Sequence, residues 1–176
     1  EQYPQAKIVA SKMAFKMMAA YFGTDFSDRQ IVCREGFELD LGGHTLRFIG
    51  AANVHWPEVM FSYDSQDKVL FSADAFGKFG ANDIEDPEGW ACEARRYYFG
   101  IVGKFGKNVQ AVLQKVAALD VEYICPLHGP VLSENLAYYV ETYTTWAHYE
   151  PENSGVTIAY ASVYGHTKQA AEELAG

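Results

Sequence analysis

KVLFSADAFG, the stretch at residues 68–77, decides the predicted fold. Its first part, residues 68–72, has the β-branched, aliphatic and aromatic side chains of a short strand, and Asp74 lies just beyond the end of that strand. Residues 60–63 (MFSY) form the preceding strand, and the polar residues 64–67 (DSQD) suit a hairpin turn. The stretch therefore predicts a hairpin whose second strand leads into a loop that carries a carboxylate.

Two histidines have the same placement as Asp74. His55 follows the strand predicted around residues 46–49, and His128 follows the apolar strand at residues 121–125. In layered α/β folds, loops that follow strands converge on one edge of the sheet, where ligands and catalytic groups collect. We therefore expect an α/β fold in which these three side chains meet.

Imidazole and carboxylate groups together suit a divalent zinc, iron or manganese ion. Each histidine would supply one nitrogen donor, whereas Asp74 has two oxygens and could bridge two metals. The alternative is structural. A lone histidine near a strand end is usually a hydrogen-bonded surface or core residue, and Asp74 could simply cap the loop that follows it. Spacing by itself leaves both interpretations open.

A second pattern, near the end of the sequence, is typical of phosphate binding. Residues 156–160 (VTIAY) have the composition of a buried strand, and residues 168–174 begin a helix. Backbone N–H groups and the helix dipole favour an anion at a helix N-terminus. Ser162 and Thr167 can donate hydroxyl hydrogen bonds there, and Gly165 allows close backbone approach. A purely structural cap of the helix is the alternative.

Further elements complete the predicted organisation. Residues 6–22 have strong helix formers and an apolar face, with Gly23 as a stop. Residues 37–49 alternate apolar and polar side chains on either side of Gly42 and Gly43, which predicts a hairpin.

A long helix is predicted over residues 92–119. Three glycines that could mark a break or a close helix approach lie inside it: Gly100, Gly103 and Gly106. Ser133 can N-cap a following helix that runs to about residue 148.

Four segments resemble those of the flavodiiron proteins, also called A-type flavoproteins. They are NVHWPE at residues 53–58, LFSADAFG at 70–77, EARRYY at 93–98 and CPLHGP at 125–130. SVYGHT at residues 162–167 resembles the FMN phosphate loop of flavodoxins, and it lies where flavodiiron proteins place their flavodoxin domain. The resemblance covers nearly the whole chain.

This resemblance implies an α/β fold of the αββα type. Residues 1–150 would be the C-terminal half of a metallo-β-lactamase-like sandwich, residues 151–155 a linker, and residues 156–176 the first βα unit of a flavodoxin-like domain. His55 and His128 would each ligate one iron, and Asp74 would bridge the pair. The residues implied to hold the FMN phosphate are Ser162, Val163, Tyr164, Gly165, His166 and Thr167.

The activity implied by the resemblance is reduction of O2 to water or of NO to N2O at the iron pair. FMN would pass electrons in, from a redox donor such as rubredoxin. In this family the FMN of one subunit sits near the irons of its partner, so a head-to-tail homodimer or a higher oligomer is expected.

The sequence also departs from the family pattern. No His-x-Glu-x-Asp set precedes His55, so three of the family's usual six ligands remain. We therefore expect the isolated chain to be inactive, and the iron pair or the FMN could be absent from it. A zinc metallohydrolase of the metallo-β-lactamase superfamily is the alternative, although the flavin-type loop argues against it.

Net charge, cysteine count and the length of apolar runs limit the partners and compartment that we expect. The formal net charge of −9 would be repelled by a phosphate backbone, so neither nucleic acid nor an anionic membrane surface is an expected partner. Three cysteines are too few and too far apart for a disulfide framework, which indicates a reducing cytoplasm. No apolar run is long enough for a membrane span.

The remaining histidines have ordinary interpretations. His44 follows the Gly-Gly turn and is expected to be a solvated hairpin residue. His148 ends a helix, where a cation complements the dipole. His166, in the phosphate-type loop, is expected either to approach the phosphate or to face solvent.

Overall fold

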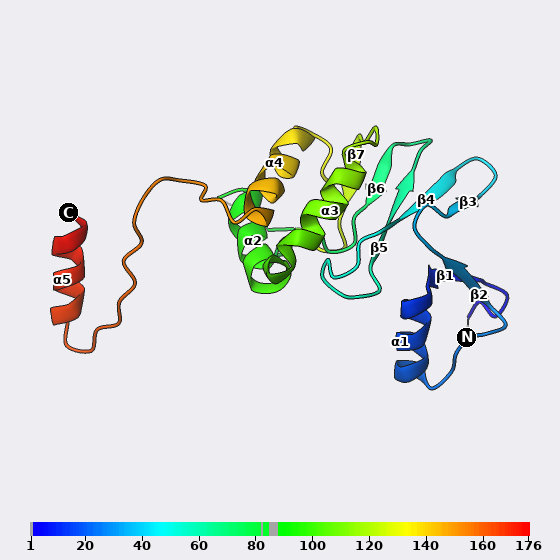
Figure 1. The fold of residues 1–176 in the computed structure, drawn as a ribbon, viewed down its shortest axis with the longest axis horizontal. Coiled ribbons are helices and arrows are strands. Elements are labelled where there is room, and N and C mark those ends of the chain that lie inside the picture. Colours follow the sequence, from blue (N-terminus) through cyan, green and yellow to red (C-terminus); the bar gives the residue numbers. More distant parts are fainter. Residues whose placement is uncertain (1, 82, 85–87) are drawn as a thin grey trace.

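A five-stranded sheet forms the centre of the molecule. The computed structural model describes residues 2–81, 83–84 and 88–176. Strand order in the sheet follows the chain (Figure 1). The strands are β3 (Glu38–Asp40), β4 (Thr45–Gly50), β5 (Met60–Asp64), β6 (Val69–Phe71) and β7 (Tyr123–Cys125). The first four are antiparallel, and β7 pairs in parallel with β6.

Both predicted hairpins are present. Asp40 pairs with Thr45 across the first turn, and Gly42 has a φ of 92° that favours glycine. Asp64 pairs with Val69 across the second turn, so β6 ends directly before the loop that carries Asp74. The parallel pairing of β7 with β6 places the loops after both strands at the same edge. This shared edge is where the predicted site residues must meet.

The expected helix over residues 6–22 is only partly correct. Its first residues form strand β1 (Ile8–Ser11), which pairs in parallel with β2 (Gln30–Cys33). The β-branched Ile8 and Val9 suit a strand, and pairing with a distant segment overrides the helical periodicity. Helix α1 (Lys12–Phe22) begins where the Ser11 hydroxyl accepts a hydrogen bond from the Ala14 amide, and it ends at Gly23 as predicted.

The long helix predicted over residues 92–119 is interrupted. Helix α2 (Trp90–Tyr97) passes through a π-helical segment (Tyr98–Val102) and a 3-10 segment (Gly103–Phe105) into helix α3 (Gly106–Val116). The three predicted glycines lie in or next to the interrupted part, and Gly106 allows a close helix approach. At Gly106 an added Cβ would lie 2.7 Å from the Ala147 carbonyl oxygen, so glycine permits the close approach of α4.

Helix α4 (Leu136–Ala147) packs against α3, and α3 also contacts β4. The predicted start of α4 was wrong. Asn135, in the left-handed conformation, precedes the helix, and Ser133 does not cap it. An aromatic cluster fills the space between α2 and α4. Trp90 stacks on Trp146 with ring centroids 5.8 Å apart, and Trp146 is fully buried. These contacts hold α2 against the body of the domain.

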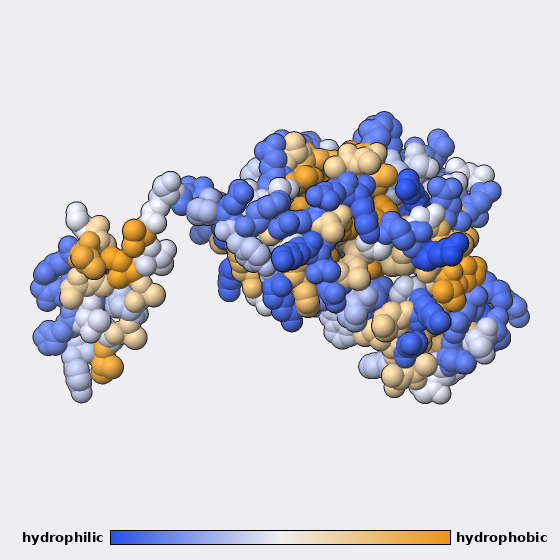
Figure 2. All heavy atoms as spheres, viewed as in Figure 1, coloured by the Kyte–Doolittle hydropathy of each residue, from blue (hydrophilic) through white to orange (hydrophobic). Residues whose placement is uncertain are grey.

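The last part of the chain stands apart from this core (Figure 1). Residues 156–160 are extended but pair with no strand of the described chain, contrary to the expected buried strand. Helix α5 (His166–Ala175) follows, two residues earlier than predicted. Val156 is 91% exposed and Leu174 is 78% exposed, so apolar side chains reach the surface of this lobe (Figure 2).

Candidate metal site

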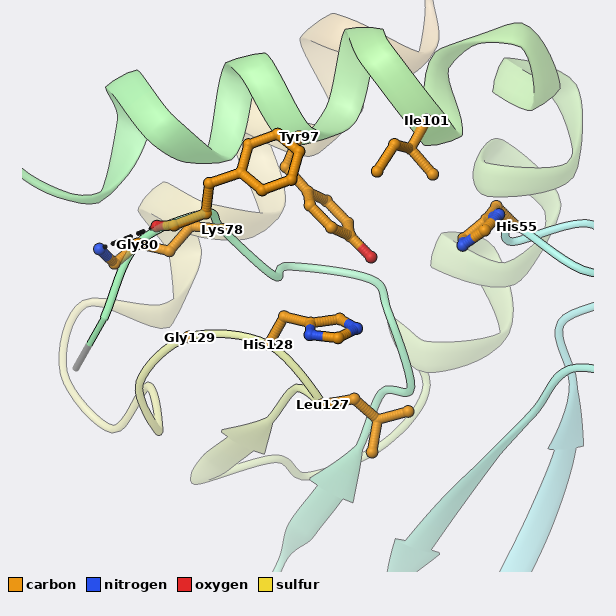
Figure 3. A pocket seen from close by; sticks show the side chains of 9 residues that line it. His55, Lys78, Gly80, Tyr97, Ile101, Leu127, His128 and Gly129 are labelled. Atoms are coloured by element: carbon orange, nitrogen blue, oxygen red, sulfur yellow. Dashed lines mark hydrogen bonds between the residues drawn. The ribbon is translucent and has the colours of Figure 1, made fainter.

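A pocket of about 530 Å³ opens at the edge of the sheet where the loops after β4, β6 and β7 meet (Figure 3). The residues that line it are His55, Lys78, Phe79, Gly80, Tyr97, Ile101, Leu127, His128 and Gly129. Figure 3 shows the imidazoles of His55 and His128 and the hydroxyl of Tyr97 directed toward one another. Loops far apart in the sequence therefore bring their polar side chains into one cavity.

Asp74 lies between the two histidines. Its Oδ2 is 3.5 Å from His55 Nε2, and its Oδ1 is 3.2 Å from His128 Nε2. The Asp74 side chain is 14% exposed, whereas that of His128 is 57% exposed. The three predicted residues thus meet, and each imidazole faces a different oxygen of one carboxylate.

The loop after β6 holds Asp74 through buried neighbours. The hydroxyl of fully buried Ser72 donates to the Ala75 carbonyl over 2.8 Å. Ala73 and Phe76 both have positive φ values, 49° and 65°, which fold the loop tightly around Asp74. Phe76 is fully buried, and its ring lies 4.5 Å from that of Tyr143. The hydrophobic core therefore fixes the loop that presents the carboxylate.

His55 is presented by a tight turn after β4. The Asn53 amide donates to the Trp56 carbonyl over 2.7 Å, and Asn53 has a φ of 65°. Val54 is fully buried and anchors the turn, and the peptide bond between Val54 and His55 is cis. Trp56, which is 50% exposed, lies beside the His55 ring.

Tyr97 joins the site from helix α2. Burial raises the pKa of its hydroxyl well above the usual range, and the charge of Asp74 and a hydrogen bond to that carboxylate raise it further. Tyr97 therefore stays protonated at neutral pH, with its hydroxyl beside the Asp74 carboxylate. Sequence reasoning gave this residue no role, because only its position on a pocket-facing turn of α2 distinguishes it from its neighbour Tyr98.

A second His/Asp group lies elsewhere, where the two hairpin turns meet. His44 Nδ1 is 2.7 Å from Asp64 Oδ2 and 3.9 Å from Asp67 Oδ2. His44 is exposed, as expected for a solvated hairpin residue, and its ring also contacts the Asp64 carboxylate, whose side chain is only 12% exposed. Among the described residues, this is the group of three whose ligand atoms all lie within 4.8 Å of one another. His55, Asp74 and His128 do not form a group that meets this distance.

The other two histidines lie at helix ends. His148 caps α4, with its Nδ1 2.8 Å from the Thr144 carbonyl oxygen. His166 begins α5 and is exposed to solvent.

The phosphate-type loop has the expected local turn. The Ser162 hydroxyl accepts a hydrogen bond from the Gly165 amide over 3.0 Å. Gly165, with a φ of 87°, precedes the first residue of α5. Val163 and Tyr164 are each 89% exposed. The loop is formed, but the described residues place nothing over it.

The fold and the pocket together define a metallo-β-lactamase-like domain. The family described as "ODP family beta lactamase" matches residues 1–129, so the chain belongs to that family. Its similar proteins bear out the resemblance to flavodiiron proteins. No helix among the described residues has the length and apolarity needed to cross a membrane.

A protein named putative diflavin flavoprotein A 2, from Synechocystis sp., is 32% identical over 99% of this chain and 31% of its own length. A variant of the flavo di-iron protein from Thermotoga maritima has a similar fold, with a TM-score of 0.82 and 23% identity over 95% of this chain and 42% of its own. The rubredoxin oxygen:oxidoreductase from Desulfovibrio gigas has a TM-score of 0.75 and 28% identity, over 82% of this chain and 38% of its own. The chain spans less than half the length of the curated relatives it matches.

Proposed function

We propose that this chain supplies part of the di-iron site of a flavodiiron oxidoreductase, with FMN as the electron carrier and O2 or NO as the substrate. One observation carries the proposal. The two oxygens of Asp74 face two different imidazoles, those of His55 and His128. A carboxylate flanked in this way suits a bridge between two metal ions, each with its own histidine.

The distances fit metal binding. Two ligand atoms that each lie about 2.1 Å from one metal are separated by about 3.0 Å in octahedral and about 3.4 Å in tetrahedral geometry. The separations of Asp74 from His55 and His128, 3.5 and 3.2 Å, are close to these values. Each His–Asp pair can therefore receive an ion with small adjustments of the side chains.

Each side chain in the pocket has a separate proposed role. His55 and His128 would each offer one nitrogen, and Asp74 would supply two carboxylate oxygens at a fixed spacing. Tyr97, which remains protonated, holds the carboxylate in orientation. His55, Asp74 and His128 would help to hold an iron pair, which would supply electron exchange with a small gaseous substrate. The exposure of His128 leaves one side of the pocket accessible to such a molecule.

The loop at residues 162–167 is proposed to hold the FMN phosphate. Its Ser162–Gly165 turn and the N-terminus of α5 supply hydroxyl and amide donors suited to a phosphate. The unpaired strand-like residues 156–160 leave this unit incomplete within the described chain. We propose that neighbouring strands and a partner subunit complete the FMN site in a homodimer or higher oligomer, with a donor such as rubredoxin.

With three of the six expected ligands, the 176-residue chain is proposed to bind metal weakly and not to turn over. Adding ferrous iron, FMN and a reduced donor, and following O2 or NO consumption, tests this. Turnover near that of a complete homologue would refute inactivity.

A zinc hydrolase is the second candidate, because the same fold and the same donor types suit zinc. Because zinc generally outcompetes ferrous iron for nitrogen and oxygen ligands, each metal is titrated into the metal-free chain separately under anaerobic conditions. Ferrous-iron binding that is lost in His55→Ala supports the di-iron proposal. Zinc binding without ferrous-iron binding, together with no response to FMN, would support the hydrolase and overturn the proposal.

A further inference from the structure

The two loops that carry Asp74 and His128 are joined by backbone hydrogen bonds. The Leu127 amide donates to the Ala73 carbonyl over 2.7 Å, directly before both ligand residues. The Lys78 amide donates to the carbonyl of His128 over 3.2 Å. These bonds lie on either side of the candidate ligands. The loops therefore form one clamped unit rather than two independent segments.

Gly77 lies at the centre of this unit. A Cβ built on it would be 3.0 Å from the Asp74 carbonyl oxygen and 3.0 Å from the His128 carbonyl oxygen, with His128 Cβ at 3.5 Å. Both close contacts are with backbone, which yields less readily than the end of a flexible side chain. The φ of Gly77 lies outside the left-handed region, so backbone conformation does not require glycine here. Space alone explains it.

Close packing continues on the other loop. An added Cβ at Gly129 would lie 3.0 Å from Lys78 Cγ, and Gly129 also has a φ of 101°. Gly77 thus approaches the His128 loop while Gly129 approaches the Asp74 loop. Absence of side chains at these two positions allows the loops to approach as closely as their hydrogen bonds require.

We infer that Gly77 is a positioning residue that sets the spacing between Asp74 and His128. A methyl group at this position pushes against the backbone of both residues at once, so it widens their 3.2 Å side-chain separation or tilts His128 out of the pocket. Metal–ligand distances in well-formed sites lie within about 0.2 Å of their usual values. A shift of a few tenths of an ångström is therefore enough to weaken binding. This inference rests on the proposed metal site.

The test compares Gly77→Ala with Gly100→Ala, using Co²⁺ alone as the probe. Gly100 is exposed, has open space where a Cβ would lie and a φ outside the left-handed region, so it is a matched control. We expect Gly77→Ala to bind Co²⁺ about tenfold or more weakly by titration and to alter the visible absorption of bound Co²⁺. Gly100→Ala should bind as the unsubstituted chain does. His55→Ala identifies the signal that belongs to the pocket.

Amide hydrogen exchange provides a readout that does not depend on metal, and it also reports whether the variant folds. In the unsubstituted metal-free chain, the Leu127 and Lys78 amides should exchange slowly. In Gly77→Ala they should exchange faster, while amides of β4 and β5 remain protected. A general loss of folding would instead speed exchange throughout the sheet.

The outcomes separate the two claims. If the unsubstituted chain binds no Co²⁺, or binds it equally after His55→Ala, the proposed metal site fails. If the pocket binds Co²⁺ and Gly77→Ala binds it with unchanged affinity and spectrum, the inference about Gly77 fails alone. Unprotected Leu127 and Lys78 amides in the unsubstituted chain would also overturn it, because no clamp would then exist.

Discussion

The pocket loops and the phosphate-type loop differ in how much of their surroundings this chain supplies. Asp74 is fixed by β6, by buried Phe76 and by hydrogen bonds to the loop of His128. The loop at residues 162–167 has its own turn and helix start, but residues 156–160 before it pair with no described strand. A local motif can form its turn without a sheet, whereas convergence of distant ligands requires the packed core.

The largest expected difference is in stability. Trp146→Ala should lower the free energy of unfolding by about 3–5 kcal/mol, because it removes a fully buried ring from the cluster with Trp90. Tyr164→Ala in the exposed phosphate-type loop should change it by less than about 0.5 kcal/mol. Denaturant titration of both variants measures this. Equal losses would show that residues 156–176 are as integrated as the core.

Next in size is the effect on metal binding. Asp74→Asn keeps the shape of the side chain but removes its charge and one oxygen, so affinity for Co²⁺ should fall by about 100-fold. Ser162→Ala, in the other region, should leave that affinity unchanged. Titration calorimetry gives both values. Unchanged binding in Asp74→Asn would remove the carboxylate from the site.

A smaller effect is expected from Tyr97→Phe. Loss of the hydroxyl frees the Asp74 carboxylate to rotate and should weaken Co²⁺ binding by about tenfold. Tyr164→Phe, which removes an exposed hydroxyl, is the control. If Tyr97→Phe binds metal as the unsubstituted chain does, the hydrogen bond to Asp74 has no positioning role.

The smallest predicted effect concerns pH and a region away from both sites. Burial would raise the pKa of Asp64, but hydrogen bonds from the Gln66 amide and His44 outweigh it and hold that pKa below the ordinary value. Because the folded-state pKa is depressed, this contribution to stability is complete above about pH 4 and is lost as pH falls through the folded-state value. Asp64→Asn should flatten the pH dependence of unfolding below about pH 4. An unchanged profile would contradict it.

The hairpins and the proximity of His55, Asp74 and His128 could be predicted from the sequence, because local residue patterns indicate turns and strand ends. Sequence reasoning placed β1 inside a helix, since parallel pairing of Ile8–Ser11 with Gln30–Cys33 is a tertiary contact that local propensity does not reveal. It also missed the start of α4 at Asn135, where a left-handed residue replaced the expected serine cap.

Other parts of the site depend on packing and could not be predicted. Tyr97 and Tyr98 are neighbours with the same side chain, and only the orientation of α2 selects Tyr97 for the pocket. Gly77 looks like an ordinary loop glycine until the backbone of His128 is placed beside it. The His44–Asp64 pair needed the register of two adjacent hairpins.

Anomalous diffraction from crystals of the chain soaked in Co²⁺ tests the central claim most directly. We expect metal density within coordination distance of the Asp74 carboxylate, shared with His55 or His128. Density at His44, Asp64 and Asp67 with none at Asp74 would contradict it.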